Sequence, residues 1–200
     1  GITVFVGSDP SAWNYPLPDL AVTSPGIAPE STLGKLAATP ACPVLSELEF
    51  GYLQCACPII AITGTNGKTT TTELTVHCLK AAGLRVMASG NIGTAIIRAA
   101  AESHALDYMV VEVSSFQLEH CHQFAPVAGT CLNVTPDHLD RHGTMEEYFQ
   151  VKMKLFQHIR NPKNIIVRAD LAHEAALMLG REAPPPSDLT IAGIIDPETL

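Results

Sequence analysis

The chain has 200 residues, 46% of them hydrophobic, which is enough apolar material to bury a core in one large domain or two small ones. Its formal net charge of −8 at pH 7 argues against a nucleic-acid partner, because phosphate neutralisation requires clustered lysine and arginine. No apolar run approaches the roughly 18 to 20 residues of a membrane span, so we expect no membrane insertion and a cytoplasmic protein.

The first 57 residues predict two short strands, each ended by turn residues, and then helical segments. The strands are Ile2–Val6 and Leu20–Thr23. A helix is expected from Pro29 to about Ala38, and Pro43–Gln54 has helical spacing of its apolar residues. Proline disfavours helix in the residue before it, so the run Cys55–Pro58 predicts a break, and we place a domain boundary after residue 57.

From residue 58 to 200, strand-like apolar runs alternate with helical segments. The expected strands are Ile59–Ile62, Leu84–Ala88, Tyr108–Val113, Val127–Val134, Asn164–Arg168 and a short one in Leu189–Ile195, and the expected helices are Thr69–Ala82, a segment ending near Ser103, and Met145–His158. Such alternation implies βαβ units and a parallel sheet that gathers ligands at the carboxyl ends of its strands. The sequence therefore predicts an α/β fold, with a partial Rossmann-like N-terminal domain (1–57) followed by a P-loop-type central domain whose mostly parallel sheet is flanked by helices (58–200).

The cysteines and the chain ends carry further expectations. Six cysteines are scattered through apolar contexts without the paired C-x-x-C sets of a zinc site, so we expect reduced, mostly buried thiols. The run Glu119–Phe124 (EHCHQF) crowds potential ligands together without a second half, which favours a polar turn over a metal site. The chain starts without methionine inside a strand-like run and stops without a terminal signal, so we expect a fragment of a longer protein.

A glycine-rich loop lies in the stretch Ile59–Leu74 (IIAITGTNGKTTTTEL), between an expected strand and an expected helix. It has only the G-x-x-G-K-T core of a phosphate-binding loop, because Ile62 stands where the usual spacing has its first glycine. Glycines let backbone N–H groups turn inward, the lysine after them can reach terminal phosphates, and the next threonine hydroxyl can ligate Mg²⁺. The alternative is a glycine turn followed by a solvated lysine, which the flanking strand and helix disfavour.

Two polar residues near strand ends are candidates for the same site. Glu112 follows three apolar residues, and a buried carboxylate must be paired or bind a metal, so it could anchor the Mg²⁺ of a nucleotide. The alternative is a strand-end acid exposed to water. His138 suits a metal ligand or a phosphate contact, although a histidine with this placement alone is more often structural.

The segment after His138 is dense in charge. Asp137, Asp140 and Arg141 could simply cap and brace the next helix. Lys152 lies on that helix, where a lysine is ordinarily a solvated residue, and spacing alone does not distinguish it from Lys154.

Four motifs, in this order and at these separations, resemble the Mur ligase superfamily. They are GTNGKTTTTEL, GNIGT, EVSSFQLE and NVTPDHLDRHGTMEEY followed by a lysine, and the similarity covers Ala21 to about Ala169. The signature of this family is G-T-x-G-K-[ST], which accounts for the missing glycine. The resemblance implies an ATP-dependent, ADP-forming acid–amino-acid ligase of peptidoglycan biosynthesis that uses Mg²⁺.

Residues after the EVSS motif distinguish branches of the superfamily. Folylpolyglutamate synthases usually continue G-T-N-G-K with Gly-Ser, and the diaminopimelate- or lysine-adding ligases typically have histidine where this chain has Phe116. Phe116 and Gln117, together with SPGI at Ser24–Ile27, resemble the D-glutamate-adding branch. That branch implies UDP-N-acetylmuramoyl-L-alanine and D-glutamate as substrates and an acyl-phosphate intermediate. We also expect a monomer.

The resemblance also implies roles for individual residues. The ATP phosphates would lie against Gly64, Thr65, Asn66, Gly67, Lys68, Thr69 and Thr70. Catalysis and Mg²⁺ binding would involve Lys68, Thr69, Glu112, His138 and a carbamylated Lys152. The substrate diphosphate would lie against Ser24, Pro25 and Gly26, and its muramoyl-alanine end against Asn91, Ser114 and Gln117.

The same resemblance places parts of the family's fold outside this chain. These are the uracil-binding start of the N-terminal domain, the adenine-binding remainder of the central domain, and the C-terminal domain, which we expect activity to require. The alternatives are another Mur ligase or a folylpolyglutamate-synthase-like ligase, a P-loop switch or binding module, and an inactive fragment that retains ATP affinity.

Overall fold

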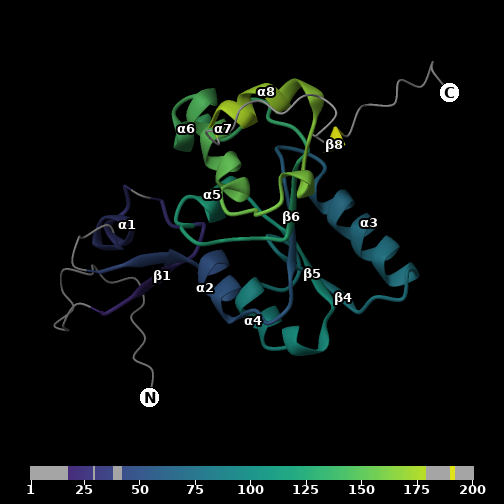
Figure 1. The fold of residues 1–200 in the computed structure, drawn as a ribbon. Coiled ribbons are helices and arrows are strands. Elements are labelled where there is room, and N and C mark those ends of the chain that lie inside the picture. The colour runs from purple at the N-terminus through teal and green to yellow at the C-terminus, as the bar shows by residue number, and fades with distance from the viewer. Residues whose placement is uncertain (1–17, 29, 38–41, 179–189, 192–200) are drawn as a thin grey trace.

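The computed structural model describes residues 18–28, 30–37, 42–178 and 190–191, and Figure 1 shows how their helices and strands are arranged. The expected strand Ile2–Val6 lies outside the described residues. Among the helices that are described, none has both the length and the apolar character that crossing a membrane requires. The described strands form two separate sheets.

The smaller sheet pairs two short strands in parallel, β1 (Ala21–Thr23) and β2 (Val44–Ser46). Helix α1 (Thr32–Ala37) lies between them in the chain, inside the helix expected from Pro29 to Ala38. The pairing sets Ala21 opposite Val44.

The helical expectation for residues 43–54 is only partly correct. Strand β2 forms first, and helix α2 (Glu47–Gln54) follows it directly. Ser46 explains the change, because its backbone is extended (φ −69°, ψ 158°) and its Oγ accepts a hydrogen bond from Glu49 N at 3.1 Å. One residue thus ends the strand and caps the helix.

The larger sheet has six strands, and every neighbouring pair is parallel. In spatial order they are β4 (Val86–Gly90), β5 (Tyr108–Glu112), β3 (Ile59–Thr63), β6 (Ala128–Cys131), β7 (Ile165–Val167) and β8 (Thr190–Ile191). This confirms the predicted α/β fold with a mostly parallel sheet. Because β3 lies between β5 and β6, the carboxyl ends of these three strands are neighbours.

Helices cover both faces of this sheet, with α3 on one side and α2, α4, α5 and α7 on the other (Figure 1). Their bounds are α3 Lys68–Ala81, α4 Ile96–Ala100, α5 Ser115–Leu118, α6 Leu139–His142, α7 Met145–Met153 and α8 Ala169–Met178, with 3₁₀ turns at Ser103–Ala105, Lys154–Phe156 and Pro162–Asn164. The helix expected over Met145–His158 therefore ends five residues early and continues as a 3₁₀ turn.

The main hydrophobic core lies under the face that carries α2, α4, α5 and α7. Alternate residues of the central strands point into it, among them Ile59 of β3 and Met109 of β5. Leu48 of α2, Ile96 of α4 and Phe149 of α7 pack against them. A large buried core of this kind holds the strand ends in fixed positions.

Helix α2 joins the six-stranded sheet unit although it precedes the predicted boundary after residue 57. Leu48 is fully buried in the common core, and a Cβ on Gly51 would lie only 2.6 Å from Ile96 Cγ2 of α4. The two sheets are nonetheless separate. The boundary stays a prediction.

Candidate functional site

The candidate site begins at the glycine loop, residues 64–70, which joins β3 to the first turn of α3. Gly64 and Gly67 have φ values of 150° and 82°, and a Cβ on Gly64 would lie 3.1 Å from Leu132 Cβ, so a side chain would be strained at both positions. Gly67 is the N-cap of α3, and no side chain of the described residues caps this helix. Its first N–H groups are therefore available to an anion.

Asn133, just after β6, holds this loop in place. Its Oδ1 accepts hydrogen bonds from Thr65 N (3.1 Å) and Asn66 N (2.9 Å), and its Nδ2 donates to Asn66 O (3.0 Å). Thr65 is fixed a second time, because its Oγ1 accepts from Thr135 N at 3.0 Å and lies 3.3 Å from the Tyr148 hydroxyl. The loop is thus braced by the segment that follows the neighbouring strand.

Lys68 folds back onto the loop that precedes it. Its Nζ donates to Gly64 O at 3.0 Å and to Thr65 O at 2.8 Å. Two backbone carbonyls thus solvate the ammonium group. A terminal phosphate could replace these carbonyls as the acceptor of the Lys68 hydrogen bonds, because phosphate oxygens also accept from an ammonium group.

Glu112 ends β5 beside the loop and is only 1% exposed. Its Oε2 accepts from Thr69 Oγ1 at 2.8 Å, and its Oε1 accepts from Asn91 Nδ2 at 2.9 Å. Thr69 and Asn91 are neutral donors, so they satisfy the hydrogen bonds of the carboxylate but do not balance its charge. A carboxylate and a hydroxyl oxygen held together are ligands that Mg²⁺ prefers.

Lys152, on α7, is 1% exposed and points at the loop from the other side. Its Nζ donates to Gly64 O at 3.0 Å, the carbonyl that Lys68 also reaches, and lies 4.6 Å from the centroid of the Tyr148 ring. Burial lowers the pKa of Lys152 to about 8, and the charge of Lys68 contributes in the same direction. Lys154 points elsewhere and donates to Glu119 O at 2.8 Å, so the structure separates the two lysines that spacing alone leaves equal.

His138 lies at the edge of this cluster, with its ring centroid 6.5 Å from that of Tyr148. It is the only non-glycine residue of the described part with positive φ (53°), and its side chain is 47% exposed. Its ring packs against Phe116, with centroids 4.8 Å apart, and its Nε2 lies 3.5 Å from Asp137 Oδ2. Within the described residues no hydrogen bond joins it to Glu112, so its metal-binding role stays a prediction.

Ser114 and Gln117 form a reciprocal cap at the start of α5. Ser114 Oγ accepts from Gln117 N at 3.3 Å, and Gln117 Oε1 accepts from Ser114 N at 3.0 Å. Their polar atoms thus stabilise the helix start in this structure. Contact with a substrate stays a prediction for both.

The Ser24–Gly26 turn follows β1 and approaches the six-stranded sheet unit through its carbonyl groups. Arg141 donates to Pro25 O at 3.1 Å and to Ile27 O at 3.2 Å. The role of this turn as a diphosphate site is untested by these contacts.

The structure also bears on the predicted state of the cysteines and on metal binding by His, Cys, Asp and Glu side chains. All six cysteines are free, and Cys42, Cys57, Cys121 and Cys131 are buried. Burial raises the pKa of Cys121 to about 12, so this thiol stays protonated at neutral pH. In the ranges that the structure describes, no three His, Cys, Asp or Glu side chains are gathered into a metal-binding group.

Comparison with known proteins identifies the family of this site. Residues 62–190 match the model of the Mur ligase middle domain, which is more than half of the chain. The chain belongs to the Mur ligase family. The range that matches includes the glycine loop, Glu112, His138 and Lys152.

Several relatives of this Mur ligase chain are named UDP-N-acetylmuramoylalanine--D-glutamate ligase. That of Caldanaerobacter subterraneus subsp. tengcongensis is 44% identical over 152 residues, which cover 76% of this chain and 34% of the relative. That of Legionella pneumophila (strain Paris) is 44% identical over 136 residues, covering 68% of this chain and 30% of the relative. The chain therefore spans about a third of the length of these relatives.

Solved structures of Mur ligases share the fold. The MurF ligase of Thermotoga maritima in complex with ADP has a TM-score of 0.53 at 21% identity, covering 74% of this chain and 35% of that chain. The UDP-N-acetylmuramate:L-alanyl-gamma-D-glutamyl-meso-diaminopimelate ligase of Neisseria meningitides has a TM-score of 0.54 at 15% identity, covering 79% of this chain and 55% of that chain. Both likenesses concern the fold alone.

Two residues of this Mur ligase domain were not singled out by the sequence analysis. Asn133 lies inside the strand expected over Val127–Val134, whereas β6 ends at Cys131, so no local pattern marks this residue as a brace of the glycine loop. Tyr148 lies four residues before Lys152 on α7, and this spacing sets both on one helix face.

Proposed function

We propose that the full-length protein that contains this chain is an ATP-dependent ligase that joins D-glutamate to UDP-N-acetylmuramoyl-L-alanine in peptidoglycan biosynthesis. The observation that carries this proposal is the buried Glu112 carboxylate, which accepts hydrogen bonds from Thr69 of the glycine loop and from Asn91. The names of the relatives support the choice of substrates. We place the reaction in the cytoplasm and expect a monomer.

The glycine loop would bind the phosphates of ATP. The loop supplies the open first turn of α3 and the Lys68 ammonium. Asn133 accepts from the N–H groups of Thr65 and Asn66, so it fixes the loop backbone before any ligand arrives, while the first turn of α3 stays open. Such preorganisation lowers the cost of binding.

Mg²⁺ fits the chemistry of the neighbouring side chains. Glu112 and Thr69 offer a carboxylate and a hydroxyl oxygen 2.8 Å apart, and the buried charge of Glu112 lacks a cationic partner among its hydrogen-bond donors. A site of one or two carboxylates plus substrate phosphates is typical of Mg²⁺. The ion would neutralise phosphate charge, and we include His138 as a further ligand only by family resemblance.

Lys152 is a candidate for carbamylation. At pH 7 a lysine with a pKa of about 8 has roughly a tenth of its amine uncharged, far more than an ordinary lysine. The uncharged nitrogen would attack the carbon of CO₂, form an N–C bond and release one proton, which yields a carboxylate-like group. That group would lie beside Lys68 and could orient Mg²⁺.

Lys152→Ala tests the carbamate. We expect loss of most ligase activity and partial recovery when acetate or another short carboxylate is added. Lys154→Ala is the matched control, and its activity should not respond to acetate. A Lys152→Ala enzyme as active as the wild type would contradict the carbamate role.

The chemistry requires activation of a carboxylate, which is a poor acyl donor. An oxygen of the L-alanine carboxylate would attack the γ-phosphorus of ATP, with ADP as the leaving group, to give an acyl phosphate. The amine of D-glutamate would then attack the carbonyl carbon, lose a proton and expel phosphate. Lys68 and the loop amides would hold the γ-phosphate in line and offset the repulsion between two anions, which is positioning and electrostatic catalysis.

The substrate would reach the loop from the side of β1 and β2. We assign Ser24, Pro25 and Gly26 to its diphosphate, and Asn91, Ser114 and Gln117 to its muramoyl-alanine end. The hydrogen bond from Asn91 to Glu112 supports the assignment of Asn91, because it places the Asn91 amide next to the groups that would react. Ser114 and Gln117 would have to exchange their mutual cap for substrate contacts.

Phosphate release by the full-length protein tests the proposal. We expect ATP-dependent release that needs both UDP-N-acetylmuramoyl-L-alanine and D-glutamate, with little release when L-glutamate, L-lysine or meso-diaminopimelate replaces D-glutamate. Stimulation by one of these instead would indicate another Mur ligase, and stimulation by a folate substrate would indicate a folylpolyglutamate synthase. Nucleotide turnover that ignores every such pair would indicate a P-loop switch, and no turnover an inactive protein.

A further inference from the structure

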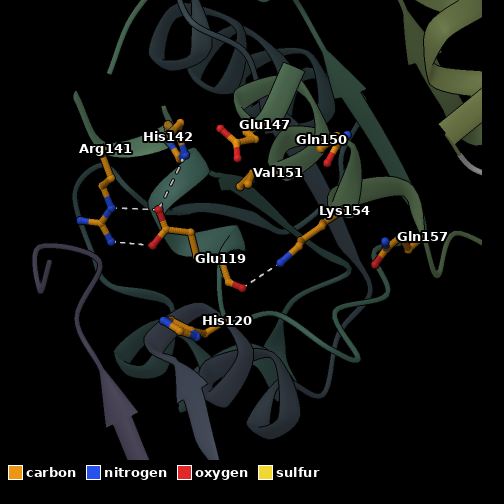
Figure 2. Close-up of a pocket in the computed structure, with 9 residues that line it drawn as sticks. All are labelled: Glu119, His120, Arg141, His142, Glu147, Gln150, Val151, Lys154 and Gln157. Atoms are coloured by element: carbon orange, nitrogen blue, oxygen red, sulfur yellow. Dashed lines mark hydrogen bonds and ion pairs between the residues drawn. The ribbon is translucent and has the colours of Figure 1, made fainter. Parts of the chain in front are cut away.

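Arg141, on α6, makes four side-chain hydrogen bonds. Its side chain is only 13% exposed. Its Nε and Nη2 donate to Glu119 Oε1 and Oε2 at 2.8 and 2.6 Å, as Figure 2 shows, and its Nη1 and Nη2 donate to Pro25 O and Ile27 O at 3.1 and 3.2 Å. Four of the five N–H donors of a guanidinium are thereby engaged, which leaves little capacity for a ligand.

These bonds join distant parts of the chain. Glu119 lies 22 residues before Arg141, just after α5, whereas Pro25 lies 116 residues before it in the turn after β1. In the part of the chain that the structure describes, Arg141 supplies the hydrogen bonds that tie this turn to the six-stranded sheet unit. The planar fork of arginine suits such a bridge, because one edge pairs with a carboxylate while other N–H groups reach the carbonyls.

The flat face of the same guanidinium touches an aromatic group. Its central carbon lies 4.2 Å from the centroid of the Phe116 ring. Phe116 in turn packs against His138 and His142, with ring centroids 4.8 and 5.4 Å away. A movement of Arg141 would therefore shift both the Ser24–Ile27 turn and the Phe116 ring that packs against His138.

We infer that Arg141 is a positioning residue, which fastens the Ser24–Ile27 turn to the sheet end and so fixes where the diphosphate of the substrate binds. The inference rests on the proposed function for the identity of the ligand. Arg141 acts through the turn and through Phe116, since its donors are already engaged. ATP binding depends on a different brace, Asn133, and should be largely independent of Arg141.

The test compares Arg141→Lys and Arg141→Gln with Arg85→Gln in the full-length protein. Arg85 pairs with Asp107 by the same fork, at 2.7 and 3.2 Å, but it is exposed and touches neither the turn nor Phe116. Arg141→Lys keeps the charge beside Glu119, so it should fold even if Arg141→Gln does not. Its single ammonium cannot reach all four acceptors.

For Arg141→Lys we expect the KM for UDP-N-acetylmuramoyl-L-alanine to rise at least about tenfold, equivalent to about 1.4 kcal/mol, while the KM for ATP changes less than about threefold. Amide hydrogen exchange should speed up across residues 24–28 and stay unchanged across residues 64–70. Arg85→Gln should change none of these quantities.

An equal rise in the KM for ATP and the KM for UDP-N-acetylmuramoyl-L-alanine would overturn the inference. So would a fall in kcat with both KM values unchanged. The exchange measurement does not need activity. If wild-type protein lacks the ligase reaction, the proposed function fails, whereas the fastening of the turn still stands or falls on faster exchange at residues 24–28 in Arg141→Lys.

Discussion

Burying a charged lysine should weaken the fold, and Lys152→Met tests this cost directly. Lys152 is 1% exposed, and its pKa is lowered from 10.5 to about 8, chiefly by burial. Methionine keeps the unbranched apolar stem and removes the charge. Gly64 O, which loses one donor, still accepts from Lys68. We therefore expect Lys152→Met to be more stable than the wild type and nearly inactive.

The magnitude follows from the pKa. Lowering it from 10.5 to about 8 corresponds to about 3 kcal/mol, because one pH unit is worth about 1.4 kcal/mol. This is an upper value, since the mutation also removes a hydrogen bond, so we expect a gain of about 1–3 kcal/mol in the free energy of unfolding at pH 7.

The gain should depend on pH in a defined direction. Below about pH 8 the lysine is protonated in both folded and unfolded chains, and the penalty is complete. Between about 8 and 10.5 the unfolded chain binds the extra proton, so wild-type stability rises with pH relative to the variant. The pH-dependent part of the advantage of Lys152→Met should fall to half at about pH 9.2, midway between the two pKa values.

Urea unfolding in CO₂-depleted buffer at several pH values measures this difference. Lys80→Met, at an exposed position on α3, is the control and should change stability by less than about 0.5 kcal/mol at each pH. A Lys152→Met protein that is less stable than the wild type at pH 7, or a difference that does not vary with pH, would refute the reasoning.

Three further predictions concern packing, the loop and the carboxylate. Gly51→Ala should lower stability by about 2 kcal/mol, seen as a lower Tm, because the new Cβ would lie 2.6 Å from Ile96 Cγ2, whereas alanine ordinarily favours a helix; an unchanged Tm would contradict the packing. Asn133→Ala removes three hydrogen bonds from the loop and should raise the KM for ATP about tenfold without changing that for the UDP substrate, and equal effects on both would argue against it. Glu112→Gln should lower kcat at least about 100-fold while nucleotide affinity without Mg²⁺, measured by calorimetry, stays near that of the wild type; retention of Mg²⁺-dependent turnover would exclude the proposed role.

Much of the sheet could be predicted because its signals are local. The runs at β3 and β5 are apolar and end in polar motifs, and the structure confirms strands there. The strand β2 could not be predicted, because it has three residues and is stabilised by pairing with β1, a tertiary contact. Its apolar residues also continue the helical spacing of α2.

The site likewise combines residues that local patterns predict with residues that only long-range contacts bring together. The glycine loop and Glu112 are recognisable from residue type and position alone. The brace from Asn133 requires that β6 pair with β3, with Cys131 opposite Thr63, which no local pattern reveals. The contact of Arg141 with Pro25 spans 116 residues, so the sequence suggests only that Arg141 braces a nearby helix. Long-range registers decide which side chains meet.

The central claim is that ATP activates the carboxylate of the substrate as an acyl phosphate. It is tested most directly by labelling the L-alanine carboxylate of UDP-N-acetylmuramoyl-L-alanine with a heavy oxygen isotope and analysing the phosphate released in the presence of D-glutamate by mass spectrometry. The mechanism predicts that each phosphate formed with the amide product carries one labelled oxygen. Unlabelled phosphate accompanied by amide formation would contradict it.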